Sequence, residues 1–452
     1  MEWKGAKVVV VGLAKSGVAA ASLLLQQGAR VVGNDIRSAE QLDPDALALG
    51  ARGATLVLGG HDPALFASAT AIVVSPGVPN MPALQAAEAA GVPIVSEVEL
   101  AASFLRGTLI GITGTNGKST VTTLVGEMCR NSGRPTFVGG NLGTPLVFAV
   151  GTAAAAPGGY LVAELSSFQL ERAGRLHMAA ACLLNVTDDH LDRYASRAAY
   201  AEAKANIFRN QCERDAAVVP SGDPECEALA RRGNGTLYRF GGEHGDVYIH
   251  GDALVDRQSG LSVPTARIGL AGKHNLDNAC AASLLARQSG VDPVEIERAL
   301  IAFRGLPHRT QHVRALDGVD YYDDSKGTNV GAAVAAIDGL SDRPGKIVLI
   351  AGGRDKGGAY EPLAARMRAH GRGAVLLGEA APLIRAAFTA AGVAVDDAAD
   401  MPTAVRAARR LALPGDAVLL SPACSSFDMF RSYAHRGEVF QDAVMDLDRV
   451  PR

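Results

Sequence analysis

A glycine-rich turn between a strand-like run and a helix-like run constrains the fold of this chain more than any other feature. Residues 108–112 are largely apolar, residues 111–120 read GITGTNGKST, and residues 121–128 resemble the start of a helix. Glycines in such a turn let backbone N–H groups approach phosphate oxygens. The lysine adds a positive charge at the β- and γ-phosphates, and the hydroxyl after it can hold Mg²⁺. The sequence therefore predicts a phosphate loop that binds ATP or a close relative.

The phosphate loop departs from the strict motif at one position. The pattern G-x-x-x-x-G-K-[ST] would place glycine at position 112, where this chain has Ile112. The alternative is a plain strand-to-helix turn whose lysine is solvated, but the flanking strand and helix favour the phosphate loop. The residues expected to contact the nucleotide are Gly114, Thr115, Asn116, Gly117, Lys118, Ser119 and Thr120.

Strand-like and helix-like runs alternate along almost the whole chain, which favours parallel α/β sheets. The length of 452 residues is too great for one hydrophobic core. We expect a Rossmann-like domain over residues 1–105 and a central P-loop ATPase-like domain with a mainly parallel sheet over residues 106–306. A second Rossmann-like domain is expected over residues 307–452.

Charge and cysteine content exclude several classes of protein. The formal net charge is −3, with acidic and basic residues interspersed, so no nucleic-acid partner is expected. The six cysteines form no C-x-x-C pair, which favours a reducing compartment. The N-terminal apolar run lacks the length and cleavage site of a signal peptide, and no run is long enough to span a bilayer. We expect a soluble, cytoplasmic monomer that does not associate with membranes.

In the first block, polar loops follow the expected strands. A G-x-x-x-x-G loop over residues 12–17 follows the first strand, Asp35 follows the second, and a Ser75-Pro-Gly77 turn follows the fourth. The loop is not the G-x-G-x-x-G fingerprint, so the signal for a nicotinamide dinucleotide is weak. It can equally receive another nucleotide diphosphate, with Asp35 accepting from a ribose or base and Arg37 stacking or pairing with phosphate. Ordinary tight turns are the alternative.

In the second block, acidic residues gather at strand ends. Glu164 ends a strand-like run near the phosphate loop, where a carboxylate can hold Mg²⁺. The loop over residues 185–192 packs three carboxylates and His190 together. His190 could be a metal ligand or a general base, although Mg²⁺ prefers oxygen ligands. Lys204 lies on a helix-like stretch and, from sequence alone, is a solvated helix lysine.

In the third block, polar clusters follow three strand-like runs, over residues 323–329, 352–356 and 421–427. Lysines, hydroxyls and helix starts at one sheet edge suit a carboxylate-bearing substrate or nucleotide phosphates. Each cluster could alone be plain loop chemistry. Cys424 has no dedicated histidine partner, so a nucleophilic cysteine is not expected.

Together these motifs resemble the Mur ligase family, the ATP-dependent amino-acid ligases of peptidoglycan precursor synthesis. The residues that carry the resemblance are GTNGKST at 114–120, GGNLG at 139–143, ELSSFQLE at 164–171, NVTDDHLDRY at 185–194, KHNLDNA at 273–279, PHR at 307–309, DDSKGTN at 323–329, GGRDKG at 352–357 and SPACSSFDMF at 421–430. They span essentially the whole chain in the family's order.

Within the family, the short first block and the SPACSSFDMF segment are most similar to the member that adds D-glutamate to UDP-N-acetylmuramoyl-L-alanine. Members that add L-alanine, a diamino acid or a D-Ala-D-Ala dipeptide are less similar there. The chain departs from the usual pattern at Gly327, Ser425 and Phe427, and none of these positions carries charge. The resemblance implies an acyl-phosphate intermediate, two Mg²⁺ sites, and a carbamate on the lysine at position 204.

The resemblance also implies roles for individual residues. Lys118, His190 and Lys204 would be catalytic, and the metal ligands would be Ser119, Glu164, His190 and the Lys204 carbamate. The residues implied for the nucleotide's adenine, phosphate and ribose are Asn275, Arg309 and Asp324. Those implied for the UDP substrate are Leu13, Ala14, Lys15, Ser16, Asp35, Arg37, Ser75 and Gly77, with Asn141 near its reacting carboxyl group. Those implied for D-glutamate are Lys326, Thr328, Lys356, Ser426 and Phe427.

Two readings from other classes leave part of the sequence unexplained. A nicotinamide oxidoreductase would use the first block and leave the phosphate loop without a purpose. A non-catalytic nucleotide switch would use the phosphate loop and leave DDSKGTN and SPACSSFDMF idle. A sister ligase that adds a different amino acid shares every central motif and stays open.

Overall fold

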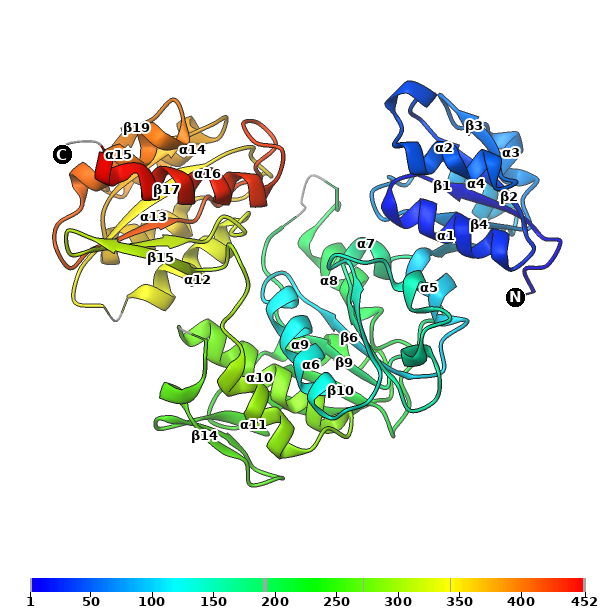
Figure 1. The fold of residues 1–452 in the computed structure, drawn as a ribbon, viewed down its shortest axis with the longest axis horizontal. Coiled ribbons are helices and arrows are strands. Elements are labelled where there is room, and N and C mark those ends of the chain that lie inside the picture. Colours follow the sequence, from blue (N-terminus) through cyan, green and yellow to red (C-terminus); the bar gives the residue numbers. More distant parts are fainter. Residues whose placement is uncertain (1, 190–192, 271, 342, 450–452) are drawn as a thin grey trace. The chain divides into compact units, whose positions relative to one another are not determined.

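Three separate β-sheets organise the chain (Figure 1). The computed structural model describes residues 2–189, 193–270, 272–341 and 343–449. The chain forms two compact units, one made of Met1–Asn185, Ala201–Val263 and Cys280–Ala299, and the other of Val186–Tyr200, Pro264–Ala279 and Leu300–Arg452. The prediction of an α/β fold with three domains is confirmed, while the exact boundaries at residues 105 and 306 stay predictions.

The first sheet is parallel and has the strand order β3-β2-β1-β4-β5. Its strands are β1 (Lys7–Val11), β2 (Arg30–Asp35), β3 (Thr55–Leu58), β4 (Ala71–Val74) and β5 (Ile94–Ser96), and its helices are α1 (Lys15–Gln26), α2 (Pro44–Ala51), α3 (Pro63–Ala67), α4 (Pro82–Ala89) and α5 (Glu97–Ala102). The strand order reverses between β1 and β4. In open parallel sheets such a switch point forms a ligand crevice at the carboxyl ends of the strands.

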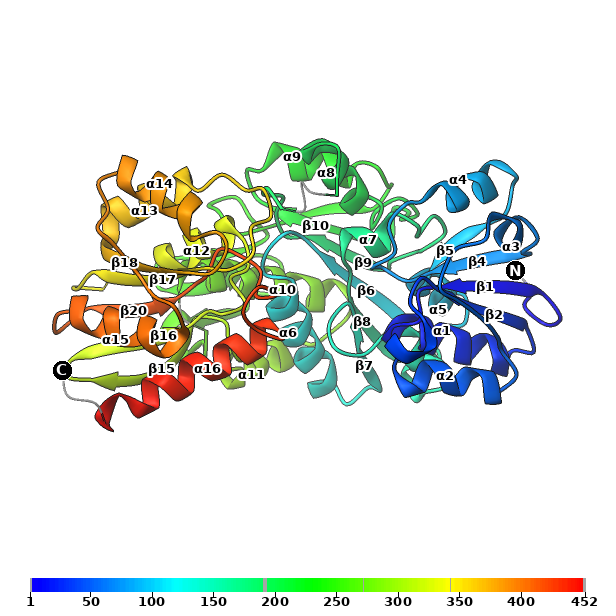
Figure 2. The same ribbon diagram turned by 90° about the horizontal axis from the view of Figure 1, so that it is seen from above.

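The second sheet has nine strands in the order β14-β13-β12-β11-β10-β9-β6-β8-β7. Its strands are β6 (Thr108–Thr113), β7 (Thr136–Gly140), β8 (Tyr160–Glu164), β9 (Ala180–Leu183), β10 (Ala216–Pro220), β11 (Thr236–Phe240), β12 (Val247–His250), β13 (Ala253–Asp256) and β14 (Ser262–Pro264). Figure 2 shows β10, β9, β6, β8 and β7 in this order. These five strands run parallel, so their carboxyl ends share one edge.

The helices that follow along the second block are α6 (Lys118–Asn131), α7 (Ser167–Leu170), α8 (Arg197–Ala205), α9 (Pro224–Ala230), α10 (Lys273–Gln288) and α11 (Pro293–Ala302). Short 3₁₀ turns lie at Ala39–Gln41, Leu146–Ala149, Ala153–Ala155, Thr265–Arg267 and Asp446–Arg449. Within the described part of the chain, no helix combines the length and the apolar character needed to cross a membrane.

The third sheet has the order β15-β16-β20-β17-β18-β19, and β15 alone runs antiparallel to its neighbour. Its strands are β15 (Gln311–Leu316), β16 (Val319–Asp323), β17 (Ile347–Gly352), β18 (Gly371–Leu377), β19 (Val395–Asp397) and β20 (Ala417–Leu420). Its helices are α12 (Val330–Leu340), α13 (Glu361–His370), α14 (Ala381–Ala390), α15 (Met401–Leu411) and α16 (Tyr433–Met445).

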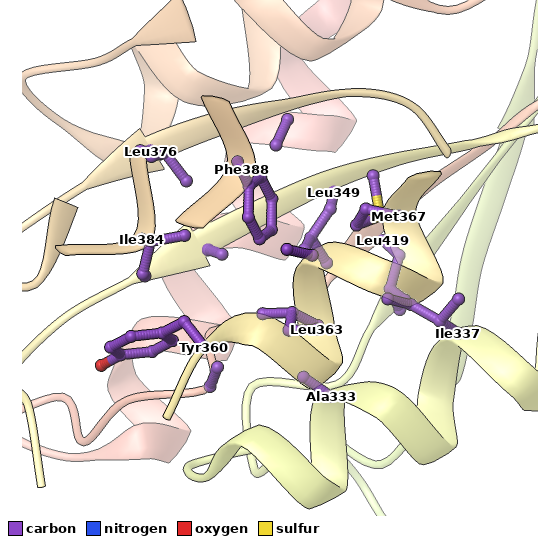
Figure 3. Close-up of a cluster of buried hydrophobic side chains, with 14 of the residues drawn as sticks. Ala333, Ile337, Leu349, Tyr360, Leu363, Met367, Leu376, Ile384, Phe388 and Leu419 are labelled. Carbon is purple, nitrogen blue, oxygen red and sulfur yellow. The ribbon is translucent and has the colours of Figure 1, made fainter. Parts of the chain in front are cut away.

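Both faces of the third sheet are buried, as expected for parallel strands covered by helices on each side. Leu349 and Leu419 face one way and pack with Leu363, Met367 and Phe388 of the covering helices (Figure 3). The neighbouring residues along the same strands face the opposite way, because successive side chains alternate. They pack in a second cluster with residues of α15 and α16.

Three edge or near-edge strands were not predicted from the sequence: β7, β15 and β19. Strand β15 is largely polar and half-exposed, so its sequence lacks an apolar run. A usable signal was nevertheless present. Asp317 and Gly318 both have positive φ between β15 and β16, which is the two-residue Asp-Gly hairpin turn.

Candidate active site

The phosphate loop joins β6 to α6, as the sequence predicts. Gly114 has φ of +148°, and a Cβ atom there would come within 2.9 Å of the Leu184 Cβ, so only glycine fits. Asn185 braces the loop from the end of β9. Its backbone oxygen accepts from Thr115 N (3.0 Å), and its side-chain Oδ1 accepts from Asn116 N (2.9 Å). These two hydrogen bonds therefore fix the backbone conformation of the phosphate loop.

Two lysines converge on one carbonyl oxygen of this loop. Lys118 Nζ donates to Gly114 O (2.9 Å) and to Thr115 O (2.7 Å). Lys204 Nζ donates to the same Gly114 O at 2.8 Å, and the residue is 1% exposed. The sequence alone made Lys204 a solvated helix lysine, and that interpretation is wrong. Two ammonium groups on one acceptor repel each other, most strongly where water is excluded.

Glu164 ends β8, next to β6 in the sheet, and is 3% exposed. Its Oε1 accepts from Asn141 Nδ2 at 2.7 Å, whereas its buried Oε2 has no hydrogen-bond partner among the described residues. A buried carboxylate oxygen without a donor is costly unless a cation or ligand satisfies it. Ser119, in the first turn of α6, adds a buried hydroxyl. This oxygen-donor set fits Mg²⁺. His190, the other predicted ligand, lies outside the described residues.

The carboxylate of Asp35 organises the loops of the first sheet. Its Oδ2 accepts from Leu13 N (2.7 Å), and its two oxygens accept from Arg37 Nε and Nη2, both at 2.9 Å. The bidentate Arg37 contact is the main cause that holds the pKa of Asp35 well below its usual range. Asp35 therefore positions both the Leu13 loop and the Arg37 guanidinium, so its carboxylate is already engaged before any ribose arrives.

Close backbone packing brings the other predicted residues of this sheet together. Gly17 must be glycine, because a Cβ there would lie 1.8 Å from Gly12 O. Ser75 Oγ donates to that same oxygen at 2.7 Å, which ties the loop after β4 to the loop after β1. Lys15 Nζ donates to Gly143 O at 2.6 Å and so links the first sheet to the GGNLG loop. Ala14, Ser16 and Gly77 lie in these same loops.

In the third sheet, Asp324 follows β16 and is buried. Its Oδ2 accepts from Ser421 Oγ at 2.7 Å, and its Oδ1 accepts from Thr310 N at 3.1 Å. Burial raises the pKa of Asp324 to about 7, and the positive charge of Arg309 opposes that rise. Near neutral pH this carboxyl group can therefore donate or accept a hydrogen bond, which suits a ligand that carries hydroxyl groups. Asn275 lies in the first turn of α10, where Asn278 Nδ2 donates to its Oδ1 at 3.2 Å.

A cavity of about 380 Å³ in the second unit is lined by Lys356 and Asn329. Asn329 Nδ2 donates to Asp189 Oδ2 at 3.0 Å, and Lys356 Nζ lies 3.4 Å from Asp189 Oδ1. Tyr360 also lines the cavity. A lysine, an amide and a carboxylate around one cavity can hold both the amine and the acid of an amino acid. Sequence reasoning missed Tyr360, which carries no motif.

The other residues predicted to hold the amino acid do not line this cavity. Lys326 Nζ lies 4.0 Å above the ring of Tyr433. Phe427 is 65% exposed, Ser426 is buried in the loop after β20, and Thr328 lies in the loop after β16. The structure brings only Lys356 of the five to the cavity, so the role of the other four stays a prediction.

Arg436 of α16 joins the two loops that carry these residues, and sequence reasoning missed it. It is 1% exposed. Its Nη2 donates to Ser325 O at 2.8 Å and to Cys424 O at 3.2 Å, and its Nε donates to Ser325 Oγ at 3.1 Å. Burial lowers the pKa of Arg436 to about 10, so the guanidinium stays charged at neutral pH. It therefore clamps the loop after β16 to the loop after β20.

Family models match nearly the whole chain. They are the Mur ligase MurD-like N-terminal domain over residues 6–96, the Mur ligase middle domain over 112–286, and the Mur ligase glutamate ligase domain over 308–424. The UDP-N-acetylmuramoylalanine–D-glutamate ligase of Geotalea daltonii is 44% identical over 455 residues. The alignment covers 99% of this chain and 99% of that enzyme. The enzyme of the same name from Myxococcus xanthus is 44% identical, with 98% of this chain and 99% of the relative covered.

Solved structures share the fold at lower identity. The MurF ligase of Thermotoga maritima in complex with ADP has a TM-score of 0.61 at 20% identity and covers 93% of this chain and 96% of its own. A pseudomurein peptide ligase type C from Methanothermus fervidus has a TM-score of 0.61 at 18% identity and covers 98% of this chain and all of its own. At such identities these structures support the architecture alone.

Proposed function

The chain belongs to the Mur ligase family, and on that premise we propose that it joins D-glutamate to UDP-N-acetylmuramoyl-L-alanine with ATP. ADP and phosphate are the other products, and the reaction belongs to peptidoglycan precursor synthesis. Full-length relatives that carry this activity in their names support the choice of substrates. The use of ATP is supported by the phosphate loop, by Lys118 at that loop, and by the buried Glu164 oxygen that lacks a hydrogen-bond partner among the described residues. The six free cysteines suit a cytoplasmic enzyme.

The chemistry has two steps. The carboxylate of UDP-N-acetylmuramoyl-L-alanine attacks the γ-phosphate of ATP and forms an acyl phosphate, and ADP leaves. The amine of D-glutamate then attacks the acyl carbon, and phosphate leaves from the tetrahedral intermediate. Phosphoryl transfer asks the protein mainly for positioning and charge neutralisation. Lys118 moves from the loop carbonyls to the phosphates, and Asn141 orients the reacting carboxyl group from its place beside Glu164.

Ser119, Glu164 and His190 would hold Mg²⁺ at two sites. When bound, the metal neutralises phosphate charge and orients the γ-phosphate for in-line attack. Hydrogen bonds between side chains orient the groups that would bind the metal. Asn141 Nδ2 donates to one oxygen of Glu164, and the other oxygen is buried without a hydrogen-bond partner among the described residues.

Substrate contacts divide among the three sheets. The UDP group is assigned to Leu13, Ala14, Lys15, Ser16, Asp35, Arg37, Ser75 and Gly77. The adenine, phosphate and ribose of ATP are assigned to Asn275, Arg309 and Asp324. D-Glutamate is assigned to Lys356 at the cavity, together with Lys326, Thr328, Ser426 and Phe427.

Lys204 carries a carbamate in this proposal. The buried Nζ of Lys204 shares the acceptor Gly114 O with Lys118 Nζ. Its reaction with CO₂ releases a proton and replaces the amine's positive charge with a negative one. The carbamate nitrogen keeps an N–H, while its two new oxygens carry a negative charge. The repulsion between two cations then becomes an attraction, and the site gains a further oxygen ligand for Mg²⁺.

We expect Lys204→Ala to lower the ligase rate at least 100-fold, because the carbamate oxygens are lost from the metal site. A small carboxylate such as acetate, added at high concentration, should restore part of the rate by filling the vacated space. Labelling the wild type with ¹³C-bicarbonate should give a carbamate NMR signal that the variant lacks. Full activity of the variant without added carboxylate would contradict the carbamate.

One assay tests the proposed function. The enzyme is incubated with ATP, Mg²⁺ and UDP-N-acetylmuramoyl-L-alanine, and D-glutamate, L-alanine, L-lysine or meso-diaminopimelate is offered in turn. We expect phosphate release and a new UDP-linked product with D-glutamate alone. Product formation only with another amino acid would move the assignment to a sister ligase, and no ATP turnover with any of them would reject ligation.

A further inference from the structure

A histidine, a cysteine and an aspartate meet in the second sheet, away from the phosphate loop. His177 Nε2 lies 2.8 Å from Asp215 Oδ2, and Cys212 Sγ lies 3.0 Å from the same oxygen. All three candidate ligand atoms lie within 4.8 Å of one another. Asp215 is buried, Cys212 is partly buried, and the other five cysteines are buried.

The cluster lies at the amino ends of β9 and β10, whereas the candidate active site lies at the carboxyl ends of the strands. His177 precedes β9 by three residues, and Asp215 directly precedes β10. The phosphate loop instead follows the end of β6, which is parallel to β9. The four residues of β9 span about 13 Å, so the cluster and the phosphate loop are separated by at least the length of a strand. Nothing in the proposed ligase chemistry uses these three residues.

The donor set matches one class of metal. Imidazole and thiolate ligands favour Zn²⁺ and similar transition metals over Mg²⁺, and a carboxylate completes many such sites. In a tetrahedral complex with ordinary bond lengths, the ligand atoms would lie about 3.4–3.6 Å apart. The observed separations of 2.8 and 3.0 Å are hydrogen-bonded distances, so a metal would need each pair to open by a few tenths of an ångström.

The aspartate is already fixed in place to act as a ligand. Cys212 N donates to Asp215 Oδ2 at 2.7 Å, and Asp215 N donates to Cys212 O at 2.9 Å, which closes the turn. Thr236 N donates to Asp215 O at 2.8 Å and anchors the turn to β11. Hydrogen bonds from the backbone orient carboxylates that bind metals, and they form whether or not a metal is bound.

We propose that His177, Cys212 and Asp215 bind one Zn²⁺ ion, with solvent at the fourth position. The metal takes the place of the Cys212 thiol proton, which is released to solvent, and of the His177 proton at Nε2, which moves to Nδ1. His177 also lines a cavity of about 400 Å³ with Trp3, Arg106 and Arg175. The ion would tie the segment before β9 to the turn before β10.

Cobalt and zinc titrations of the intact protein test this site. The protein is stripped with a chelator, kept reduced, and supplied with excess Mg²⁺ so that oxygen-rich sites are filled. We expect about one equivalent of Co²⁺ to give the near-ultraviolet absorption of a cobalt–thiolate bond, and Zn²⁺ to abolish it by displacement. Zn²⁺ should also raise the thermal unfolding midpoint, because it binds the folded state.

Three variants separate this site from the candidate active site. His177→Ala, Cys212→Ser and Asp215→Asn should each weaken Zn²⁺ binding at least tenfold, and Cys212→Ser should lose the cobalt–thiolate absorption entirely. His250→Ala replaces an exposed histidine elsewhere on the same sheet and should bind as the wild type does. Asp215→Asn keeps a side-chain acceptor for the turn, so its fold is preserved. A wild type without the cobalt–thiolate signal, or a Cys212→Ser protein with unchanged Zn²⁺ affinity, would overturn the proposal.

Discussion

Replacing Lys118 with alanine is expected to lower ATP-dependent ligation by about 1,000-fold, the largest effect we predict for any single residue. The side chain begins α6 and reaches back over the loop to the carbonyl oxygens of Gly114 and Thr115. In the nucleotide complex its charge moves to the β- and γ-phosphates and stabilises the charge that develops during transfer. Removing one such preorganised group costs about 4 kcal/mol of transition-state stabilisation.

The fold should survive this substitution, because Lys118 contributes charge to a loop surface rather than volume to a core. Initial rates of phosphate release with all substrates saturating give the loss of turnover, and equilibrium dialysis with ATP gives the loss of binding. Lys7→Ala is the matched control: it removes a lysine that donates to Ser68 Oγ at an exposed site on the first sheet. A Lys118→Ala enzyme with near-normal turnover and an unchanged unfolding midpoint would refute the phosphate-loop role.

The parts of the fold that the sequence predicts correctly are those set by local pattern. Buried parallel strands are runs of apolar residues, as in β17 and in β1 after Lys7, because both faces of their sheets are covered. The phosphate loop is recognisable because its glycines and Lys118 are contiguous. Strand β15 was not predicted because all its residues are half-exposed or exposed, so it lacks a buried apolar run, and only the Asp317–Gly318 turn indicated it.

The parts of the site that the sequence does not predict depend on contacts between distant segments. Helical periodicity cannot distinguish Lys204 from a solvated lysine, because the carbonyl that accepts its hydrogen bond, Gly114 O, lies 90 residues earlier in the sequence. Arg436 likewise meets Ser325 across 111 residues of sequence, and no local motif marks it. Asp35 could be placed at a strand end, but its engagement with Arg37 and Leu13 follows only from three-dimensional geometry.

Replacing Arg436 with methionine is expected to destabilise the third sheet's loops by about 2–4 kcal/mol and to raise the KM for D-glutamate at least tenfold. Methionine fills similar volume but leaves Ser325 O and Cys424 O without the donors that the guanidinium supplies, and buried acceptors without partners are costly. The loops that carry Lys326, Thr328, Ser426 and Phe427 would then lose their common anchor. Urea unfolding and D-glutamate saturation curves measure the two effects.

Two further variants distinguish positioning from simple loss of stability. Arg436→Lys keeps a buried positive charge but has fewer donors in a different geometry, so it should recover part of the stability and less of the D-glutamate affinity. Arg431→Met makes the same chemical change at an exposed position of the same segment and should alter neither quantity. An Arg436→Met enzyme that is destabilised yet keeps its D-glutamate KM would show that the clamp supports the fold without positioning the substrate loops.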